Sequence, residues 1–179
     1  IIGSFKKKNR KIKLLNFKTR LGKGGALLKG IEKARFDELI LFDADESMPV
    51  QEIPLLLNAL KTADIVIGSR NLKHSRVSKP FNRSISSFFS HLAITRVFGI
   101  KEDTQSGFKA LRKSSFQKLP AFKNLNYIWD VELIYNAKKL GLKVKEVAIT
   151  WNYKRGSKLS LLDAFAMLLQ LISFKFSML

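Results

Sequence analysis

Apolar and polar positions along this chain predict helices that alternate with strands. The continuous apolar run at 39–42 and the segment 64–69, with Ile65-Val66-Ile67 at its centre, are typical of buried strands. Apolar and charged residues alternate over 143–151, which indicates a strand with one exposed face. Between these runs, apolar residues recur at helical spacing. The expected strands are 12–17, 39–42, 64–69, 108–111 and 143–151, and the expected helices are 24–35, 50–60, 80–98 and 129–140.

This alternation favours an α/β fold with a mostly parallel sheet flanked by helices. The chain has 179 residues, about one domain, and we find no internal repeat or low-complexity tract in it. With 46% hydrophobic residues it can bury a core. Ligands of such sheets bind at the carboxyl ends of the strands, so the residues that follow strands are the first site candidates.

The composition narrows the possible chemistry. Lys and Arg outnumber Asp and Glu by 33 to 14, which gives a net charge of +19. This excess favours an anionic partner such as nucleic acid, anionic lipid or a phosphate-bearing substrate. The absence of cysteine excludes disulfides, thiolate zinc sites and cysteine nucleophiles. A bound metal would therefore rest mainly on oxygen ligands, which favours Mg²⁺ or Mn²⁺.

The sharpest candidate site is the acidic pair Asp43 and Asp45, which directly follows the apolar run 39–42. Residues i and i+2 of an extended backbone project to the same side, so the two carboxylates lie together. Two like charges side by side are unfavourable unless a cation compensates them. Mg²⁺ or Mn²⁺ would do so and could also bridge a substrate diphosphate. The alternative is a solvated turn in which an aspartate caps the next helix.

Two basic positions accompany this pair. Arg70 follows the run 64–69 in Gly68-Ser69-Arg70 and offers a fixed fork for phosphate oxygens. Lys23 lies in a glycine-rich connection before the first expected helix, where exposed amides suit an anion. The spacing is not that of a phosphate-binding P-loop. For both positions the alternative is an ordinary turn.

In this order, the motifs resemble family 2 glycosyltransferases with a GT-A fold. Further matches are D-T-Q-S-G-F-K from Asp103, W-D-V-E-L from Trp129 and G-S-K-L from Gly156, so the resemblance covers essentially residues 10–175. The most similar groups are the dolichyl-phosphate glucosyltransferases and the dolichyl-phosphate mannose synthases. The first two of these motifs look more like the glucosyl branch.

The resemblance implies a role for each matched residue. Asp43 and Asp45 would hold the metal and the donor diphosphate, with Asp45 also counted as catalytic. Ser47 stands where some relatives carry a third metal ligand. Arg83 would align the acceptor phosphate as a second catalytic residue. The implied substrate-binding residues are Lys23, Asp43, Arg70, Arg83, Ser87, Asp103 and Gln105.

Asp130 is the third expected catalytic residue. In relatives with hydroxyl acceptors, a carboxylate at the position of Asp130 or Glu132 is a candidate base. The alternative is structural: Asp130 caps the helix and Glu132 pairs with a neighbouring lysine. For Asp103 and Gln105, the alternative to ordering the acceptor loop is a turn before the next strand.

The implied reaction is an inverting transfer of a hexose, with glucose favoured over mannose. The donor would be UDP-glucose or GDP-mannose, and the acceptor dolichyl or another polyisoprenyl phosphate, with Mg²⁺ or Mn²⁺ as cofactor. Relatives begin with a P-x-Y-N-E-like motif and a D-D-x-S motif that hold the nucleotide, and neither occurs here. We therefore expect a truncated GT-A catalytic domain over 1–156.

Residues 157–179 are expected to form a separate amphipathic segment. Its apolar positions are interrupted by Asp163, Gln170 and Lys175, which suits a helix lying on a bilayer surface. The segment 81–100 has the same character. We expect a membrane-associated protein on the cytoplasmic face. Core packing or an oligomer contact is the alternative for both segments.

Other classes of protein fit the charge as well. A nucleic-acid-binding module would explain the net charge, but the sequence has no recognised zinc, RRM or KH pattern. A sugar nucleotidyltransferase also uses an α/β sheet and a metal, but its glycine-rich N-terminal loop is not evident. An inactive fragment that keeps only binding is a further alternative.

Overall fold

A computed structural model of the chain describes residues 9, 11–78, 80, 91–126, 128–153 and 161–176, with the side chains of the last segment described from 169 onward. The helices are α2 (Gly22–Lys33), α3 (Ile53–Leu60) with the 3₁₀ turn η1 (Val50–Glu52) before it, α5 (Lys113–Phe116), α6 (Trp129–Lys139) and α7 (Leu161–Phe176); residues 91–98 are also helical. The strands are β1 (Glu38–Leu41), β2 (Ile65–Ser69), β3 (Arg76–Ser78), β4 (Lys109–Arg112), β5 (Val144–Ala148) and β6 (Thr150–Asn152).

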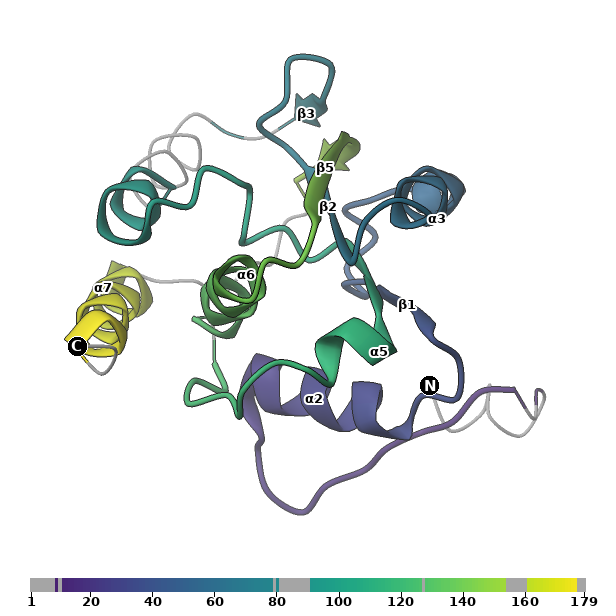
Figure 1. Ribbon diagram of the computed structural model, residues 1–179, viewed down its shortest axis with the longest axis horizontal. Coiled ribbons are helices and arrows are strands. Elements are labelled where there is room, and N and C mark those ends of the chain that lie inside the picture. The colour runs from purple at the N-terminus through teal and green to yellow at the C-terminus, as the bar shows by residue number, and fades with distance from the viewer. Residues whose placement is uncertain are drawn as a thin grey trace.

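The central sheet has four strands in the order β1-β4-β2-β5 (Figure 1). β2 and β5 are parallel, whereas β4 is antiparallel to both of its neighbours. The sheet is therefore mixed, and the expectation of a mostly parallel sheet is wrong where β4 separates β1 from β2. The chain enters β4 at the end of the sheet where β2 finishes. Two strands joined in this way run antiparallel and need no crossover connection.

Two expected strands differ in the structure. Residues 12–17 form no strand, and three apolar side chains there, Leu14, Leu15 and Phe17, are exposed. Since these side chains lie outside the core, the apolar run does not become a buried strand. The segment 143–151 is divided at Ile149 into β5 and β6, and β6 pairs with β3 in a second, two-stranded sheet. The expected helices 24–35, 50–60 and 129–140, by contrast, correspond to α2, α3 and α6 within a few residues. Of the expected helix 80–98, residues 91–98 are helical, and 81–90 lie outside the described residues.

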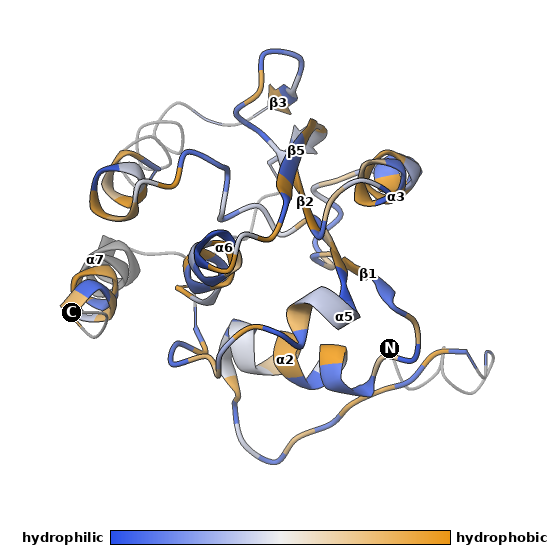
Figure 2. Cartoon of the chain, viewed as in Figure 1, coloured by the Kyte–Doolittle hydropathy of each residue, from blue (hydrophilic) through white to orange (hydrophobic). Residues whose placement is uncertain are grey.

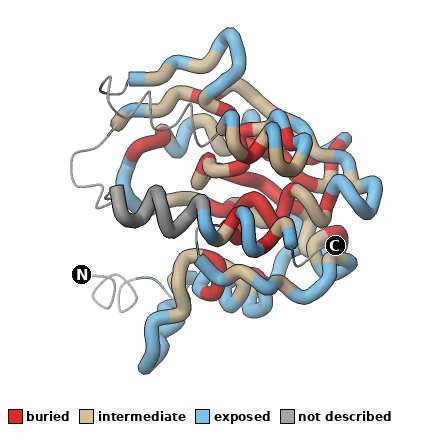
Figure 3. Tube along the Cα trace, turned by 90° about the vertical axis from the view of Figure 1, so that its left-hand side faces the viewer, coloured by how far each residue is buried: buried red, intermediate tan, exposed pale blue. Residues whose placement is uncertain are grey.

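Helices cover both faces of the central sheet, because successive strand residues point to opposite sides. Val66 packs with Leu56 and Leu60 of α3 on one face. Ile65 and Ile67 pack with residues of α2 and α6 on the other. Figure 2 shows that each of these helices carries both apolar and polar residues, and Figure 3 shows the buried positions gathered between the helical layers.

The end of α7 belongs to the same core. Leu171 and Phe174 are buried, and the Phe174 ring lies 5.5 Å from Phe98 and 6.0 Å from Tyr135. Figure 1 shows α7 beside α6 and the helix at 91–98. The expected alternative of core packing thus holds for one face of this helix. Among the described residues, no helix combines the length and apolarity needed to cross a bilayer.

Candidate active site

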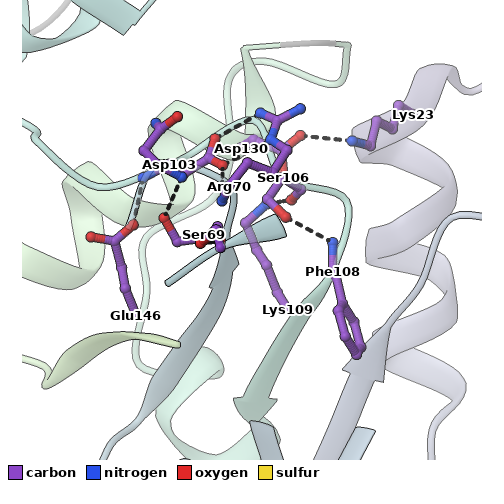
Figure 4. A network of polar contacts seen from close by, with 11 residues as sticks. Lys23, Ser69, Arg70, Asp103, Ser106, Phe108, Lys109, Asp130 and Glu146 are labelled. Carbon is purple, nitrogen blue, oxygen red and sulfur yellow. Dashed lines mark hydrogen bonds and ion pairs between the residues drawn. The ribbon is translucent and has the colours of Figure 1, made fainter. Parts of the chain in front are cut away.

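The candidate site lies at one edge of the central sheet, where β1 and β2 end and β4 begins. Leu41 of β1 and Ile67 of β2 both pair with Lys109, the first residue of β4. The loop after β1, the residue after β2 and the loop before β4 therefore meet at one place. The first turns of α2 and α6 complete the site, which Figure 4 shows from close by.

Asp43 comes from the loop after β1 and lies against the loop before β4. Its carboxylate occupies the space that a Cβ on Gly107 would fill. This contact requires glycine at 107, because any larger residue would push the carboxylate aside. Burial opposes the charges on Lys23 and Arg70, but Asp130 outweighs it for Lys23 and Asp103 for Arg70, and Asp43 adds a smaller effect in the same direction, so the pKa of both groups is raised. Three residues expected at the site are thus brought together.

Arg70 and Asp103 form a bidentate ion pair. The guanidinium Nε donates to Asp103 Oδ2 at 2.8 Å and Nη2 donates to Oδ1 at 2.7 Å, while the Arg70 backbone N–H donates to Oδ2 at 2.9 Å. Burial disfavours the charge on Asp103, but these bonds outweigh it and hold the pKa of the carboxyl below its ordinary value. The Arg70 guanidinium also lies 5.6 Å from the centre of the Trp151 ring.

This geometry refines the expected role of Arg70. Its fork is turned toward Asp103, so in this structure it orders the loop before β4. Glu146 of β5 supports the same loop, since its Oε1 accepts a hydrogen bond from the Asp103 N–H at 3.0 Å. Asp103 thus orders the loop before β4 through its bonds to Arg70 and Glu146. Gln105 lies half-buried in that loop.

Asp130 lies between two lysines. Its Oδ1 accepts a hydrogen bond from Lys109 Nζ at 2.6 Å, and its Oδ2 accepts one from Lys23 Nζ at 3.0 Å. Lys109 Nζ also donates to the carbonyl oxygen of Ser106. Asp130 does not cap its own helix through its side chain, so that alternative is wrong. Both of its carboxylate oxygens are engaged by ammonium groups instead (Figure 4).

The pKa shifts in this cluster follow from burial and from the charges of the neighbouring groups. Burial disfavours the charge on Asp130, but Lys109 and Lys23 outweigh it and lower the pKa of the carboxyl. Burial likewise opposes the charge on Lys23, yet Asp130 and Asp43 raise its pKa. For Lys109, which is only 1% exposed, burial prevails and lowers the pKa.

Lys109 is the functional candidate that the sequence reasoning missed. In the sequence it stands only as the last residue of the D-T-Q-S-G-F-K motif and within the expected strand 108–111. The signal was present, because Lys109 and Leu111 are two residues apart and therefore face the same side of the sheet. A lysine on a face that is otherwise buried needs a carboxylate partner.

Asp45 and Ser47 form a turn beside Asp43. Asp45 Oδ1 accepts a hydrogen bond from the Ser47 N–H at 3.0 Å, the geometry expected for the alternative of a local turn. The Ser47 hydroxyl is buried and has no hydrogen-bond partner among the described residues. No cluster of three or more acidic, histidine or cysteine side chains able to hold a metal occurs in the described part of the chain. The oxygen donors present thus fit a divalent cation only if a substrate supplies further ligands.

Glu132 has a structural position. It is buried, and its carboxylate accepts hydrogen bonds from the backbone N–H groups of Lys123 and Asn124, both at 2.9 Å, and from Asn124 Nδ2 at 2.8 Å. These are hydrogen bonds from backbone and amide groups, a structural role of another kind than the pairing with a lysine considered above. Arg83, Ser87 and the G-S-K-L motif lie outside the described residues.

A cavity of about 330 Å³ lies next to Lys23. Its lining residues come from the start of α2 and from the loop before α6: Arg20, Leu21, Gly22, Lys23, Ala26 and Asn126. Gly24 holds the two helices together at this point, because an added Cβ would lie 2.6 Å from the Trp129 side chain. This close approach places Lys23 within reach of Asp130.

Comparisons with known proteins agree with this architecture. The chain is 32% identical over 170 residues to a dolichyl-phosphate beta-glucosyltransferase of Trichomonas vaginalis, covering 89% of this chain and 52% of the relative. It is 34% identical over 164 residues to the dolichyl-phosphate beta-glucosyltransferase of Drosophila melanogaster, covering 84% and 49%. An undecaprenyl-phosphate mannosyltransferase of Micrococcus luteus is 31% identical over 147 residues, covering 78% and 60%. The chain thus spans about half the length of the glucosyltransferases it matches.

Solved structures show the same fold. Glucosyl-3-phosphoglycerate synthase from Mycobacterium tuberculosis superposes with a TM-score of 0.65 at 17% identity, covering 96% of this chain and 58% of that one. The fold is therefore of the GT-A type, with a mixed sheet flanked by helices. Residues 1–120 match the family model described as glycosyl transferase family 2. Taken with the relatives above, this match shows that the chain belongs to family 2 of the glycosyltransferases.

Proposed function

We propose that this chain is the catalytic part of an enzyme that transfers a hexose from a nucleoside-diphosphate sugar to a polyisoprenyl phosphate. The observation that carries the proposal is that the segments bearing Asp43, Lys23 and Arg70 converge where β1 and β2 end and β4 begins. The relatives named above are enzymes of dolichyl and undecaprenyl phosphate. Glucose is the favoured sugar, because the glucosyltransferases match over more of the chain, and mannose is next.

Asp43 and Asp45 would hold Mg²⁺ or Mn²⁺ together with the donor diphosphate. When bound, the cation would offset the charge that develops on the departing diphosphate. The mycobacterial synthase of similar fold has been solved with Mn²⁺ and UDP-glucose. In this chain the unpartnered Ser47 hydroxyl and the sparse donor set suit a site that the diphosphate completes. Lys23 would face the same diphosphate from the cavity it lines.

The acceptor would be a phosphate monoester, which is already anionic near neutral pH. Its oxygen would attack the anomeric carbon while the nucleoside diphosphate leaves, with inversion. The acceptor therefore needs alignment more than deprotonation. A general-base role for Asp130 is disfavoured, since both of its oxygens are bound by lysines and its pKa is lowered. We assign Asp130 an electrostatic role and leave the alignment of the acceptor to Arg83 and Ser87.

We also propose that the protein works at the cytoplasmic surface of a membrane, where its lipid acceptor would lie. Leu169, Ile172 and Phe176 leave apolar surface exposed on α7, on the side away from the buried Phe174. The net charge of +19 would add attraction to anionic lipid. An interfacial helix of this kind binds without crossing the bilayer.

The test is a transfer assay with the intact protein. Labelled UDP-glucose or GDP-mannose is supplied with dolichyl phosphate and Mn²⁺ or Mg²⁺, and the lipid-linked product is extracted. We expect product from UDP-glucose, its loss on chelation with EDTA, and a loss of at least about 100-fold in Asp45→Ala.

Glu46→Gln is the matched control, because it changes the neighbouring exposed carboxylate and keeps its size. This variant should turn over at the rate of the unchanged protein. Normal turnover in a folded Asp45→Ala variant would reject the metal role. Product from GDP-mannose alone would replace glucose by mannose. Binding of RNA or DNA with a steep salt dependence and no lipid product would favour the nucleic-acid module instead.

A further inference from the structure

Lys109 and Asp130 form a buried ion pair beneath the site. The Lys109 side chain is 1% exposed and the Asp130 side chain 4%. Lys109 is the first residue of β4, in the middle of the sheet, and it points toward α6 together with Leu111. A charge at such a position is costly unless it is paired and hydrogen-bonded, so its retention requires an explanation.

Two ammonium groups share one carboxylate in this cluster. Lys109 approaches Asp130 Oδ1 at 2.6 Å from within the core, and Lys23 approaches Oδ2 at 3.0 Å from the cavity side. The short inner contact is typical of a bond between charged partners. If Lys109 is charged, the three groups carry a net charge of +1. The Lys109 ammonium is buried, so the net positive charge of the three groups acts on the cavity through Lys23, whose side chain is 27% exposed.

Without Lys109, the same carboxylate would neutralise Lys23. Lys23 and Asp130 alone would carry no net charge. This pair would attract a phosphate in the cavity only weakly. The hydrogen bond that Lys109 Nζ donates to the Ser106 carbonyl oxygen also fixes the loop that carries Asp103 and Gly107. Lys109 thus contacts both α6 and the loop before β4, but it does not line the cavity.

We propose that Lys109 is a positioning residue that neutralises Asp130 from inside the core and so leaves Lys23 positive toward an anionic donor. The inference rests on the proposed function for the identity of that donor as a nucleoside diphosphate. The electrostatic relationship of the two lysines is independent of that identity. A purely structural role for Lys109 would change folding stability but not the pKa of Lys23.

The direct test measures the titration of Lys23. The lysines are reductively methylated with ¹³C-formaldehyde, which keeps their charge, and the Lys23 signal is assigned from its absence in Lys23→Arg. In Lys109→Met the pKa of Lys23 should rise above its value in the unchanged protein, since the repulsion from Lys109 is lost and the attraction of Asp130 remains. Lys29→Met is the control: it removes an exposed lysine of the same helix, paired with Glu32, and should leave the Lys23 titration in place.

A second pair of variants applies if Lys109→Met does not fold. Asp130→Asn and Lys109→Met/Asp130→Asn are compared, the latter carrying no charge at either buried position. The pKa of Lys23 should be higher in the double variant than in Asp130→Asn. Equal values in this pair, or in the unchanged protein and Lys109→Met, would show that Lys109 exerts no charge on Lys23 and would overturn the proposal.

The binding arm uses UDP with Mn²⁺ as the probe and calorimetry as the readout. Lys109→Met should weaken UDP binding by about tenfold, the factor that corresponds to roughly 1.4 kcal/mol, and Lys29→Met should leave it unchanged. Unchanged UDP affinity in Lys109→Met would overturn the proposal even if Lys23 titrates as expected. If the unchanged protein binds neither UDP nor GDP in the presence of Mn²⁺, the proposed function fails, whereas the titration still decides the link between the two lysines.

Discussion

The carboxylate of Asp43 lies in the space that a side chain on Gly107 would occupy. These residues are far apart in the sequence, one after β1 and the other just before β4. Their contact joins the acidic loop to the loop that Asp103 and Arg70 organise. The position of Asp43, a candidate metal ligand, therefore depends on residue 107 having no side chain.

Gly107→Ala should reduce activity far more than stability. The added methyl group would displace the end of the Asp43 side chain, which can rotate away at little cost in folding. We expect kcat/KM to fall by about 10- to 100-fold, since a misplacement of about 1 Å has effects of this size. The free energy of unfolding should change by less than about 1 kcal/mol. Transfer assays and urea unfolding would measure the two effects.

Gly30→Ala is the control for this variant. Gly30 lies in α2 and an added Cβ would meet no atom within 4 Å. The substitution should stabilise the protein by about 0.5–1 kcal/mol, because alanine favours a helix more than glycine does. Activity should not change. Full activity in Gly107→Ala would contradict the proposed position of Asp43.

Asp103→Asn should destabilise the protein above about pH 4 and have less effect in acid. The folded-state pKa of Asp103 lies below its ordinary 3.8, with burial opposing and the Arg70 bonds prevailing. Its stabilising contribution is thus complete above about pH 4 and is lost as the pH falls through the lower folded-state value. Loss of one partner of a buried pair costs about 3 kcal/mol near neutral pH.

The measurement is urea unfolding of both proteins from about pH 7 down to pH 2.5. The difference in unfolding free energy should shrink toward the acid end. A difference that stays constant with pH would show that the Asp103 charge is not the source of the stabilisation. Glu32→Gln, in an exposed pair on α2, should differ from the unchanged protein by less than about 0.5 kcal/mol.

Glu132→Ala should unfold the loop before α6 locally. The carboxylate accepts three hydrogen bonds from Lys123 and Asn124, and its removal leaves their donors unpaired. The free energy of unfolding should fall by about 2–4 kcal/mol. Hydrogen exchange at the amides of Lys123 and Asn124 should accelerate. If exchange there is unchanged while turnover is abolished, Glu132 would belong to the chemistry rather than to the loop.

The two faces of α7 should respond differently to substitution. Phe174 is buried against Phe98 and Tyr135, so Phe174→Ala should cost about 3–5 kcal/mol of stability. Phe176 is 70% exposed, so Phe176→Ala should cost less than about 0.5 kcal/mol. Thermal unfolding would measure both. Sedimentation with anionic vesicles should show weaker binding for Phe176→Ala, and equal binding would argue against a lipid-facing side.

Much of this fold follows from the sequence alone. The apolar runs of β1 and β2 and the helical spacing of α2, α3 and α6 are local patterns, and local patterns determine local structure. The direction of β4 could not be predicted, because it depends on which edge of the sheet the chain returns to. The apolar residues at 12–17 are a local pattern that the tertiary structure does not use.

The site divides in the same way. Asp43, Lys23 and Arg70 could be found because each follows a strand or begins a helix. The partners of Asp130 could not, since Lys23 and Lys109 are 107 and 21 residues away from it. The opposite lesson comes from Arg70, whose expected phosphate contact is replaced here by Asp103. A motif thus predicts where a side chain lies in the fold better than it predicts which group that side chain contacts.

The reversed direction of β4 has a consequence for how such an enzyme can diversify. Because β4 begins where β1 and β2 end, the segment entering it supplies the site, together with the segments leaving its neighbours. Insertions or exchanges between 99 and 108 would therefore remodel what the enzyme accepts without disturbing a strand. A change of the same size after β4 would fall at the opposite end of the strands, where Ser115 donates a hydrogen bond to Asp64, away from the residues of the candidate site.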